Sequence, residues 1–129
     1  MANSVGYHES EDKLKPETRD KHRALTSAME ELEAVDWYDQ RVDAAGDSEL
    51  KEILAHNRDE EKEHFVMLLE WYRRRDAKLS TELKNRLFAS GSIVAKEQAD
   101  KGASDESATG SATGDGSLGI GNLKGGQSL

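Results

Sequence analysis

The chain has 129 residues, with 18 Lys and Arg against 26 Asp and Glu, and therefore a formal net charge of −8. This length suits a single domain, and the acidic balance argues against nucleic acid, which requires a basic binding face. The absence of cysteine excludes disulfides, thiolate metal sites and a cysteine nucleophile. No apolar run is long enough to span a membrane, and no basic segment followed by an apolar one opens the chain, so we expect a cytoplasmic protein without a membrane partner.

Two long helical patterns come first along the chain. The first begins near Pro16, which suits the first turn of a helix, and should end at Gly46. The second is offered an N-terminal cap by Asp47 or Ser48 and runs to about Arg75. Because no segment alternates between apolar and polar residues as a strand does, the predicted class is all-α.

A shorter third helix is expected over residues 80–89, and the composition changes soon after it. Residues 101–117 contain only Lys, Gly, Ala, Ser, Asp, Glu and Thr, and so offer no apolar surface to offset the entropy of ordering the chain. We therefore predict a helical domain over residues 1–95, a flexible linker over 96–116 and a separate terminal segment over 117–129.

An antiparallel pair of the two long helices has no enclosed interior. Each helix covers one face of the other, and both leave an apolar stripe open. A foldable part of this size without disulfides is also a poor candidate for folding alone. We therefore predict obligate self-association, in which two hairpins form a four-helix bundle.

Polar residues interrupt the apolar row with which each long helix faces the other. Glu31 lies in the middle of the row on the first helix, and Glu61 and His64 lie one turn apart in the row on the second. The first row comprises Ala24, Ala28, Glu31, Val35, Tyr38 and Val42, with Leu25, Met29 and Leu32 beside it; the second comprises Leu50, Leu54, Asn57, Glu61, His64, Leu68 and Trp71.

These three polar residues are expected to meet. Glu31 lies 15 residues before the turn at Gly46 and Glu61 lies 15 after it, so an antiparallel hairpin places them opposite each other. An ionised carboxylate in an apolar row is costly unless it is paired or bound to a metal. A Glu61–His64 hydrogen bond would explain that pair alone, whereas all three residues together favour a metal site.

The ligand set combines carboxylate oxygens with imidazole and lacks sulfur, which suits iron, manganese or zinc. Ferritin-like di-metal bundles use one Glu from each of two helices and a Glu-x-x-His from each of the other two. This chain holds half of that set in Glu31 and the segment Glu61–His64. Two chains related by a two-fold axis would complete it, so the unfinished core and the half-site require the same partner.

The segments MEELEAVDWYDQR (29–41) and HNRDEEKEH (56–64) resemble the two signature segments of the encapsulated ferritins, a ferritin-like family carried inside encapsulin shells. The resemblance implies a ferroxidase that oxidises Fe(II) at a di-iron centre between two chains, in a ring of ten chains built from five dimers. Mineral would then be stored by the surrounding shell. The family's iron ligands fall on Glu31, expected to bridge the two irons, and on Glu61 and His64.

The resemblance also assigns roles around the centre. It implies that Trp37 and Tyr38 lie close to it, and that Glu30 and Glu33 form an acidic cation-access site, which calcium or another divalent cation would suit. By spacing alone, the two glutamates are a solvated like-charge pair. Tyr38 is equally well explained by core packing or by a catalytic role, and Trp37 is more simply a packing aromatic.

Two other functions would use the same ligands. A rubrerythrin-like peroxidase would share the di-iron centre, although a chain without cysteine lacks that family's rubredoxin electron-transfer module. A non-catalytic assembly module would use the metal only to clamp the dimer, and zinc would then serve as well as iron.

Large apolar residues return near the C-terminus after more than twenty positions without one, separated by glycines. By composition alone this suits a disordered tail, and the alternative is a docking peptide on a flexible tether. The pattern Leu-Gly-Ile-Gly-x-Leu resembles the encapsulin cargo-loading peptide, which implies that the shell protein is a partner and that the chain resides in an encapsulin compartment of a bacterium or archaeon. The anchors would be Leu118, Ile120 and Leu123.

Overall fold

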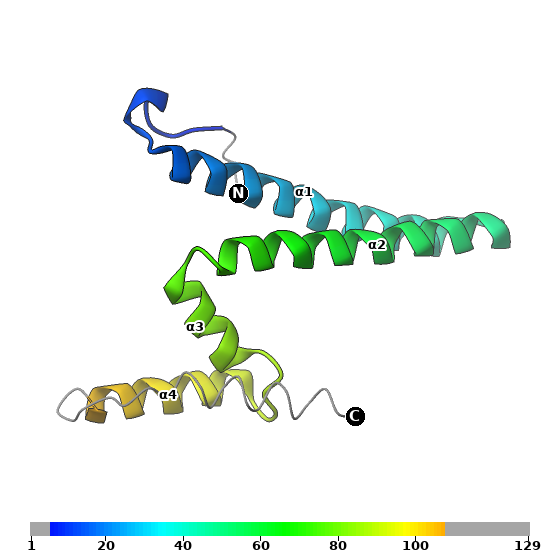
Figure 1. Ribbon diagram of the computed structural model, residues 1–129. Helices are drawn as coiled ribbons and strands as arrows, with labels where there is room; N and C mark the ends of the chain where they lie inside the picture. Colours follow the sequence, from blue (N-terminus) through cyan, green and yellow to red (C-terminus); the bar gives the residue numbers. More distant parts are fainter. Residues whose placement is uncertain (1–5, 108–129) are drawn as a thin grey trace. The chain divides into compact units, whose positions relative to one another are not determined.

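The computed structural model describes residues 6–107, and side-chain surroundings as far as residue 102. Within that range every regular element is a helix, which confirms the all-α class. No helix there combines the length and apolarity needed to cross a bilayer. The elements are a 3₁₀ helix η1 (Glu11–Lys13) and the α-helices α1 (Pro16–Ala44), α2 (Ser48–Arg73), α3 (Ala77–Arg86) and α4 (Ile93–Ser107) (Figure 1).

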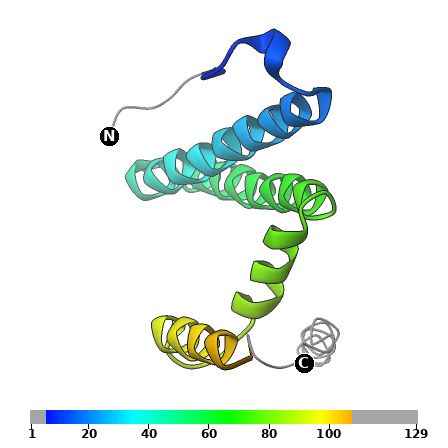
Figure 2. The same cartoon turned by 90° about the vertical axis from the view of Figure 1, so that its left-hand side faces the viewer.

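The chain divides into two compact units between Arg75 and Asp76. In the first unit, α1 and α2 lie side by side and run antiparallel, as both views show (Figures 1 and 2). With 29 and 26 residues, they are about 43 and 39 Å long. They therefore form the long hairpin that the sequence predicts.

The ends of the two long helices follow the predicted signals. Pro16 occupies the first turn of α1, and the helix ends at Ala44, two residues before Gly46. The cap of α2 is Asp47, whose carboxylate accepts a 2.8 Å hydrogen bond from the backbone N–H of Leu50. A short turn therefore connects the helices and sets which residues face each other.

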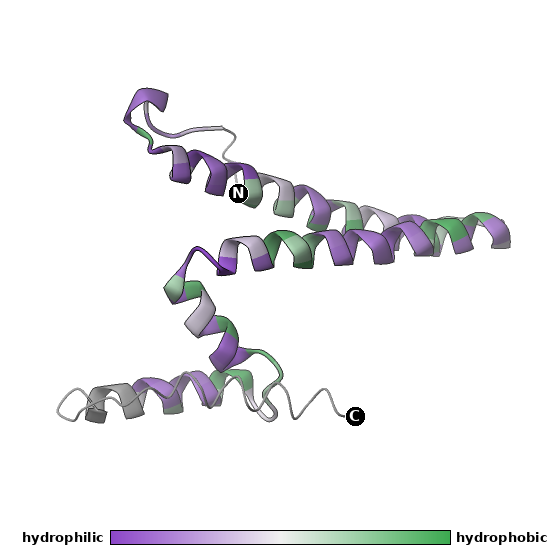
Figure 3. Cartoon of the chain, in the orientation of Figure 1, coloured by the Kyte–Doolittle hydropathy of each residue, from purple (hydrophilic) through white to green (hydrophobic). Residues whose placement is uncertain are grey.

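The hairpin has a narrow core. The predicted row on α1 does face α2, since Ala24 is buried and its other members are half-buried, but Ala24 is the only buried hydrophobic residue in the described part of the chain. Figure 3 shows hydrophobic residues in short patches separated by hydrophilic ones along both helices. Beside the row, Leu25, Met29 and Leu32 stay 47%, 59% and 48% exposed. One hairpin therefore leaves much apolar surface in solvent.

Polar contacts join α1 and α2 both near the turn and toward the open end of the hairpin. Near the turn, Nη1 of Arg58 on α2 donates a 3.0 Å hydrogen bond to Oδ1 of Asp39 on α1. Toward the open end, the ammonium of Lys21 lies 5.7 Å from the centre of the Tyr72 ring. Both contacts are consistent with a single antiparallel register.

The second unit begins with α3, which starts at Ala77 and ends at Arg86, three residues earlier at each end than the predicted helix. The reason is Asp76, whose carboxylate accepts a 2.8 Å hydrogen bond from the N–H of Leu79 and caps the helix. Beyond the helix, Phe88 has a φ of 59°, a left-handed conformation that no continuing α-helix allows.

The sequence does not predict α4, which occupies the first part of the segment assigned to the linker. Ser92 accepts a 3.2 Å hydrogen bond from the N–H of Ala95 at its start. Asp100 then pairs with Lys96 at 3.3 Å and with Arg86 of α3 at 3.0 Å. The cap and the ion pairs therefore stabilise a helix in a segment whose small residues favour a linker. The predicted domain boundaries remain predictions.

Candidate metal centre

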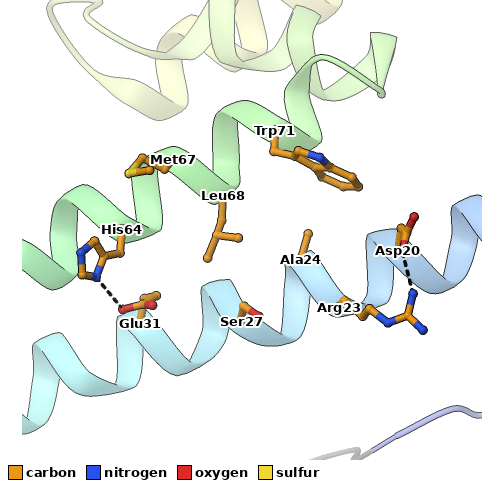
Figure 4. Close-up of a pocket in the computed structure, with 9 residues that line it drawn as sticks. All are labelled: Asp20, Arg23, Ala24, Ser27, Glu31, His64, Met67, Leu68 and Trp71. Atoms are coloured by element: carbon orange, nitrogen blue, oxygen red, sulfur yellow. Dashed lines mark hydrogen bonds and ion pairs between the residues drawn. The ribbon is translucent and has the colours of Figure 1, made fainter.

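Glu31 of α1 and Glu61 and His64 of α2 converge on one point of the hairpin. Each offers one ligand atom, and these atoms all lie within 4.8 Å of one another. Nδ1 of His64 lies 3.7 Å from Oε2 of Glu31 and 3.6 Å from Oε2 of Glu61. Figure 4 shows the His64 ring reaching toward Glu31 across the space between the helices. The structure thus brings together the three residues that the sequence pattern selects.

Local geometry explains this convergence. Residues three apart lie one above the other on a helix, so Glu61 and His64 share the face of α2 that meets α1. The short turn then sets Glu31 opposite them. The side chains of Glu31 and Glu61 are 24% exposed and that of His64 is 42% exposed, so the site lies at the margin of the interface between the helices.

The distances are compatible with a shared ion. At 3.6 and 3.7 Å, the ring nitrogen is too far from either carboxylate oxygen for a good hydrogen bond. Two ligand atoms bound to one ion at about 2.0–2.2 Å lie about 3–4 Å from each other. The donor set of carboxylate and imidazole suits iron, manganese or zinc, so the residues present fit a transition-metal ion.

The groups around Glu31 change its protonation. The pKa of Glu31 is raised, chiefly because its carboxyl shares a hydrogen bond with that of Glu61, and also because of partial burial and the charge of Glu61. His64 acts in the opposite direction. Without a cation, the site therefore holds a proton on Glu31 more firmly than solvent-exposed glutamates do, and a bound cation would replace that proton.

An open groove of about 600 Å³ runs along the hairpin from the cluster. Figure 4 shows Leu68 between the two helices, Trp71 above Ala24, and an Asp20–Arg23 ion pair at the end away from His64. Met67 was not singled out by the sequence pattern, although its position three residues after His64 could have indicated it. The groove is lined by Asp20, Arg23, Ala24, Ser27, Glu31, His64, Met67, Leu68 and Trp71.

The four residues predicted around the centre do not join the cluster in this chain. Glu30 and Glu33 are exposed on α1, Trp37 is 50% exposed and Tyr38 is half-buried. The guanidinium of Arg41 lies 5.4 Å from the Tyr38 ring centre and 6.0 Å from that of Trp37. Roles for these four residues stay predictions. The predicted anchors Leu118, Ile120 and Leu123 lie outside the described residues.

Comparison with known proteins assigns the family. A family model described as EncFtn-like matches residues 6–90. An encapsulated ferritin-like protein of Rhodospirillum rubrum is 60% identical over 126 residues, which cover 95% of this chain and 90% of that protein. The chain belongs to the encapsulated-ferritin family.

Two further relatives agree with this assignment. A ferritin-like protein of Thermotoga maritima is 46% identical over 99 residues, which cover 77% of this chain and 87% of that protein. A crystallised protein of Nitrosomonas europaea is 61% identical with a TM-score of 0.67, and the match covers 69% of this chain and 98% of that one. The resemblance that the signature segments suggest is thereby confirmed, and the all-helical structure is consistent with a ferritin-like fold.

Proposed function

We propose that this encapsulated-ferritin chain is a ferroxidase that oxidises Fe(II) to Fe(III) at a di-iron centre shared by two chains. The observation that carries the proposal is the convergence of Glu31, Glu61 and His64 within 4.8 Å beside an open groove. A carboxylate-rich site with one imidazole suits both oxidation states of iron, because anionic oxygen ligands stabilise the higher charge.

A second copy of the chain completes the site. One chain offers three ligand atoms, whereas the di-metal bundles of this fold use four Glu and two His. The groove beside the cluster exposes apolar side chains, among them Met67 at 63%, and covering such a groove with a second hairpin would remove them from water. The ligand shortage and the exposed groove therefore favour the same two-fold dimer, and a ring of five such dimers is the assembly we propose.

Each residue has a distinct role. Glu31 lies on the helix opposite the other two ligands, and we assign it to bridge the two iron ions across the two-fold axis. Glu61 and His64 of each chain hold one ion from α2. Fe(II) is the substrate: each ion loses one electron, so a pair supplies the two electrons that convert O2 and two protons to hydrogen peroxide, or hydrogen peroxide and two protons to two waters.

The neighbouring residues would support this reaction. Tyr38 and Trp37 lie on α1 beyond Glu31, and the guanidinium of Arg41 lies 5.4 Å from the ring centre of Tyr38 and 6.0 Å from that of Trp37. Glu30 and Glu33 are exposed and free to attract cations, including calcium, toward the centre. We assign them to cation access.

We further propose that the product iron passes into an encapsulin shell for mineral storage. The Rhodospirillum rubrum relative is named as an encapsulated protein, and the sequence ends with the Leu118, Ile120 and Leu123 pattern that resembles a cargo-loading peptide. The compartment would then be an encapsulin shell in the cytoplasm. Deletion of residues 117–129 should leave iron oxidation intact and abolish co-purification with a co-expressed shell protein.

Stopped-flow absorbance of Fe(III) after mixing the protein with Fe(II) in air tests the central proposal. The parent should oxidise iron rapidly, and Glu61→Gln should lose that activity, whereas Glu60→Gln, a change of the same kind at the neighbouring exposed position, should retain it. Prior addition of zinc should inhibit the parent. Iron that binds without oxidation would instead identify a metal clamp, and faster consumption of peroxide than of Fe(II) under limiting oxygen would identify a peroxidase.

A further inference from the structure

We propose that Arg58 is a positioning residue, which holds α2 against α1 in the register where Glu31 meets Glu61 and His64. The inference rests on the proposed metal function and extends it to a residue that binds no metal itself. Its basis is the ion pair that Arg58 makes across the helix interface with Asp39, close to the cluster.

Arg58 is held from both helices. Its Nη1 donates to Oδ1 of Asp39 on α1 at 3.0 Å, and its Nε donates to Oδ1 of Asp59 on its own helix at 3.1 Å. Lys62 lies 3.3 Å from the same Asp59 oxygen. The Arg58 side chain is only 23% exposed, against 54% for Asp39. The contact with Asp59 and the partial burial therefore restrict the position of the guanidinium that pairs with Asp39.

The short turn sets the overall register, but Glu31 and Glu61 each lie 15 residues from Gly46, so a contact close to them is needed to hold the two helices together there. Ala24 and Ala28, on the face of α1 that meets α2, are small, and apolar contacts of this kind do not define one register as sharply as directional ones. Where the two helices separate or slide locally, the 3.7 Å between Nδ1 of His64 and Oε2 of Glu31 lengthens, and the three ligands can no longer share an ion.

Arg58 lies three residues before Glu61, so it is on the turn of α2 next to the ligands. Asp39 lies eight residues after Glu31 on the antiparallel helix, on the same side of the site. The ion pair therefore opposes sliding close to where the metal ligands must meet. A partly exposed ion pair of this kind contributes only modestly, so the expected change in metal affinity is about fivefold.

The test uses Co(II), whose visible absorption reports both binding and coordination, titrated into metal-free, full-length protein. Arg58→Met should weaken Co(II) binding about fivefold, because only the fraction of molecules in the correct register binds. Arg58→Lys, which keeps the charge, should restore most of the loss. Arg74→Met is the matched control, since Arg74 pairs at 2.7 Å with Glu70 on its own helix, and it should bind Co(II) as the parent does.

A double variant separates positioning from general stability. Asp39→Asn with Arg58→Met should bind Co(II) no more weakly than Arg58→Met alone, because both changes remove the same contact. Thermal melting with and without Co(II) should show that the metal raises the melting temperature less in Arg58→Met than in the parent. A merely structural role would lower both melting temperatures equally and leave affinity unchanged.

The outcomes are distinguishable. If the parent binds Co(II) and Arg58→Met binds it equally well, the positioning role is wrong and the proposed metal site stands. If the double variant binds Co(II) more weakly than Arg58→Met alone, the Arg58–Asp39 pair is not the cause and the inference is overturned. If the parent itself binds no Co(II), the proposed function fails, and the inference fails with it.

Discussion

Two His–Glu pairs lie on α2, and the contrast between them separates a binding site from an ordinary surface contact. His56 and Glu60 are 2.9 Å apart, and their side chains are 69% and 55% exposed. His64 and Glu61 are 3.6 Å apart, are less exposed, and face a third ligand, Glu31, on the opposite helix. The pair with the shorter distance, His56 and Glu60, is thus the one to which we assign no function.

The difference comes from position around the helix rather than from residue type. His56 and Glu60 pair with each other on an exposed face of α2, and no third ligand residue joins them in the described part of the chain. His64, Glu61 and Glu31 lie where two helices meet, cannot hydrogen-bond well through the ring nitrogen at their spacing, and border the apolar groove. Convergence from two helices is what turns these residue types into a candidate metal centre.

The largest expected effect comes from changing each of the two histidines separately to Gln. His64→Gln should slow Fe(II) oxidation more than about a hundredfold, because even outer partners of a metal site matter about 10- to 100-fold. His56→Gln should stay within about twofold of the parent. Stopped-flow absorbance measures both, and equal losses in the two variants would show that position on α2 is irrelevant.

The groove that borders the cluster can be tested with a neighbouring pair of residues. Met67 lines the groove and is 63% exposed, whereas Val66, 57% exposed, does not line it. Met67→Glu should weaken dimerisation about 10- to 100-fold, because it buries a charge in an apolar contact, and should reduce iron oxidation in parallel. Val66→Glu should change neither. Sedimentation velocity gives the masses, and an intact Met67→Glu dimer would place the partner elsewhere.

The cluster and the exposed pair should also differ in their pH dependence. The raised pKa of Glu31 means that protons compete with cations up to a higher pH than at an ordinary glutamate. Co(II) affinity should therefore fall on acidification through that pKa, and the proton on Glu31 alone should contribute up to about tenfold per pH unit. Glu31→Gln should be weak at every pH, and Glu60→Gln should follow the parent. A Co(II) affinity of the parent that does not change with pH would contradict the competition between the proton on Glu31 and the cation.

The smallest predicted effect concerns the metal-free chain. An acid whose pKa is raised by folding stabilises the folded state only while it is protonated, so that contribution is lost as pH rises through the folded pKa. At neutral pH, Glu31→Gln should therefore raise the melting temperature of the metal-free protein, by no more than about 4 °C. The same variant should gain less from Co(II) than the parent. Calorimetry with and without Co(II) measures both, and a lower metal-free melting temperature would refute the prediction.

The sequence predicts the hairpin and its ligands because both follow from strong, local rules. Pro16 lies in the first turn of α1 and Asp47 caps α2, and helical spacing together with the turn at Gly46 predicts that Glu31 faces Glu61. The same spacing indicates that Leu25, Met29 and Leu32 lie beside the row that faces α2. It does not indicate what covers these three residues.

Other features are not readable from the sequence for identifiable reasons. The start of α3 depends on the Asp76 cap, and aspartate is equally common in turns. The helix α4 has a composition rich in small and polar residues, and it forms with a serine cap and ion pairs that include Arg86 from the preceding helix. The Arg58–Asp39 contact requires the three-dimensional register, since neither residue stands out by spacing.

Native mass spectrometry of the protein loaded with Fe(II) in the absence of oxygen tests most directly whether each chain supplies half of the iron site. The account predicts two iron ions for every two chains, and no retained iron on single chains released from the assembly. A folded single chain that holds iron through Glu31, Glu61 and His64, and oxidises it on exposure to air at the rate of the assembly, would contradict it.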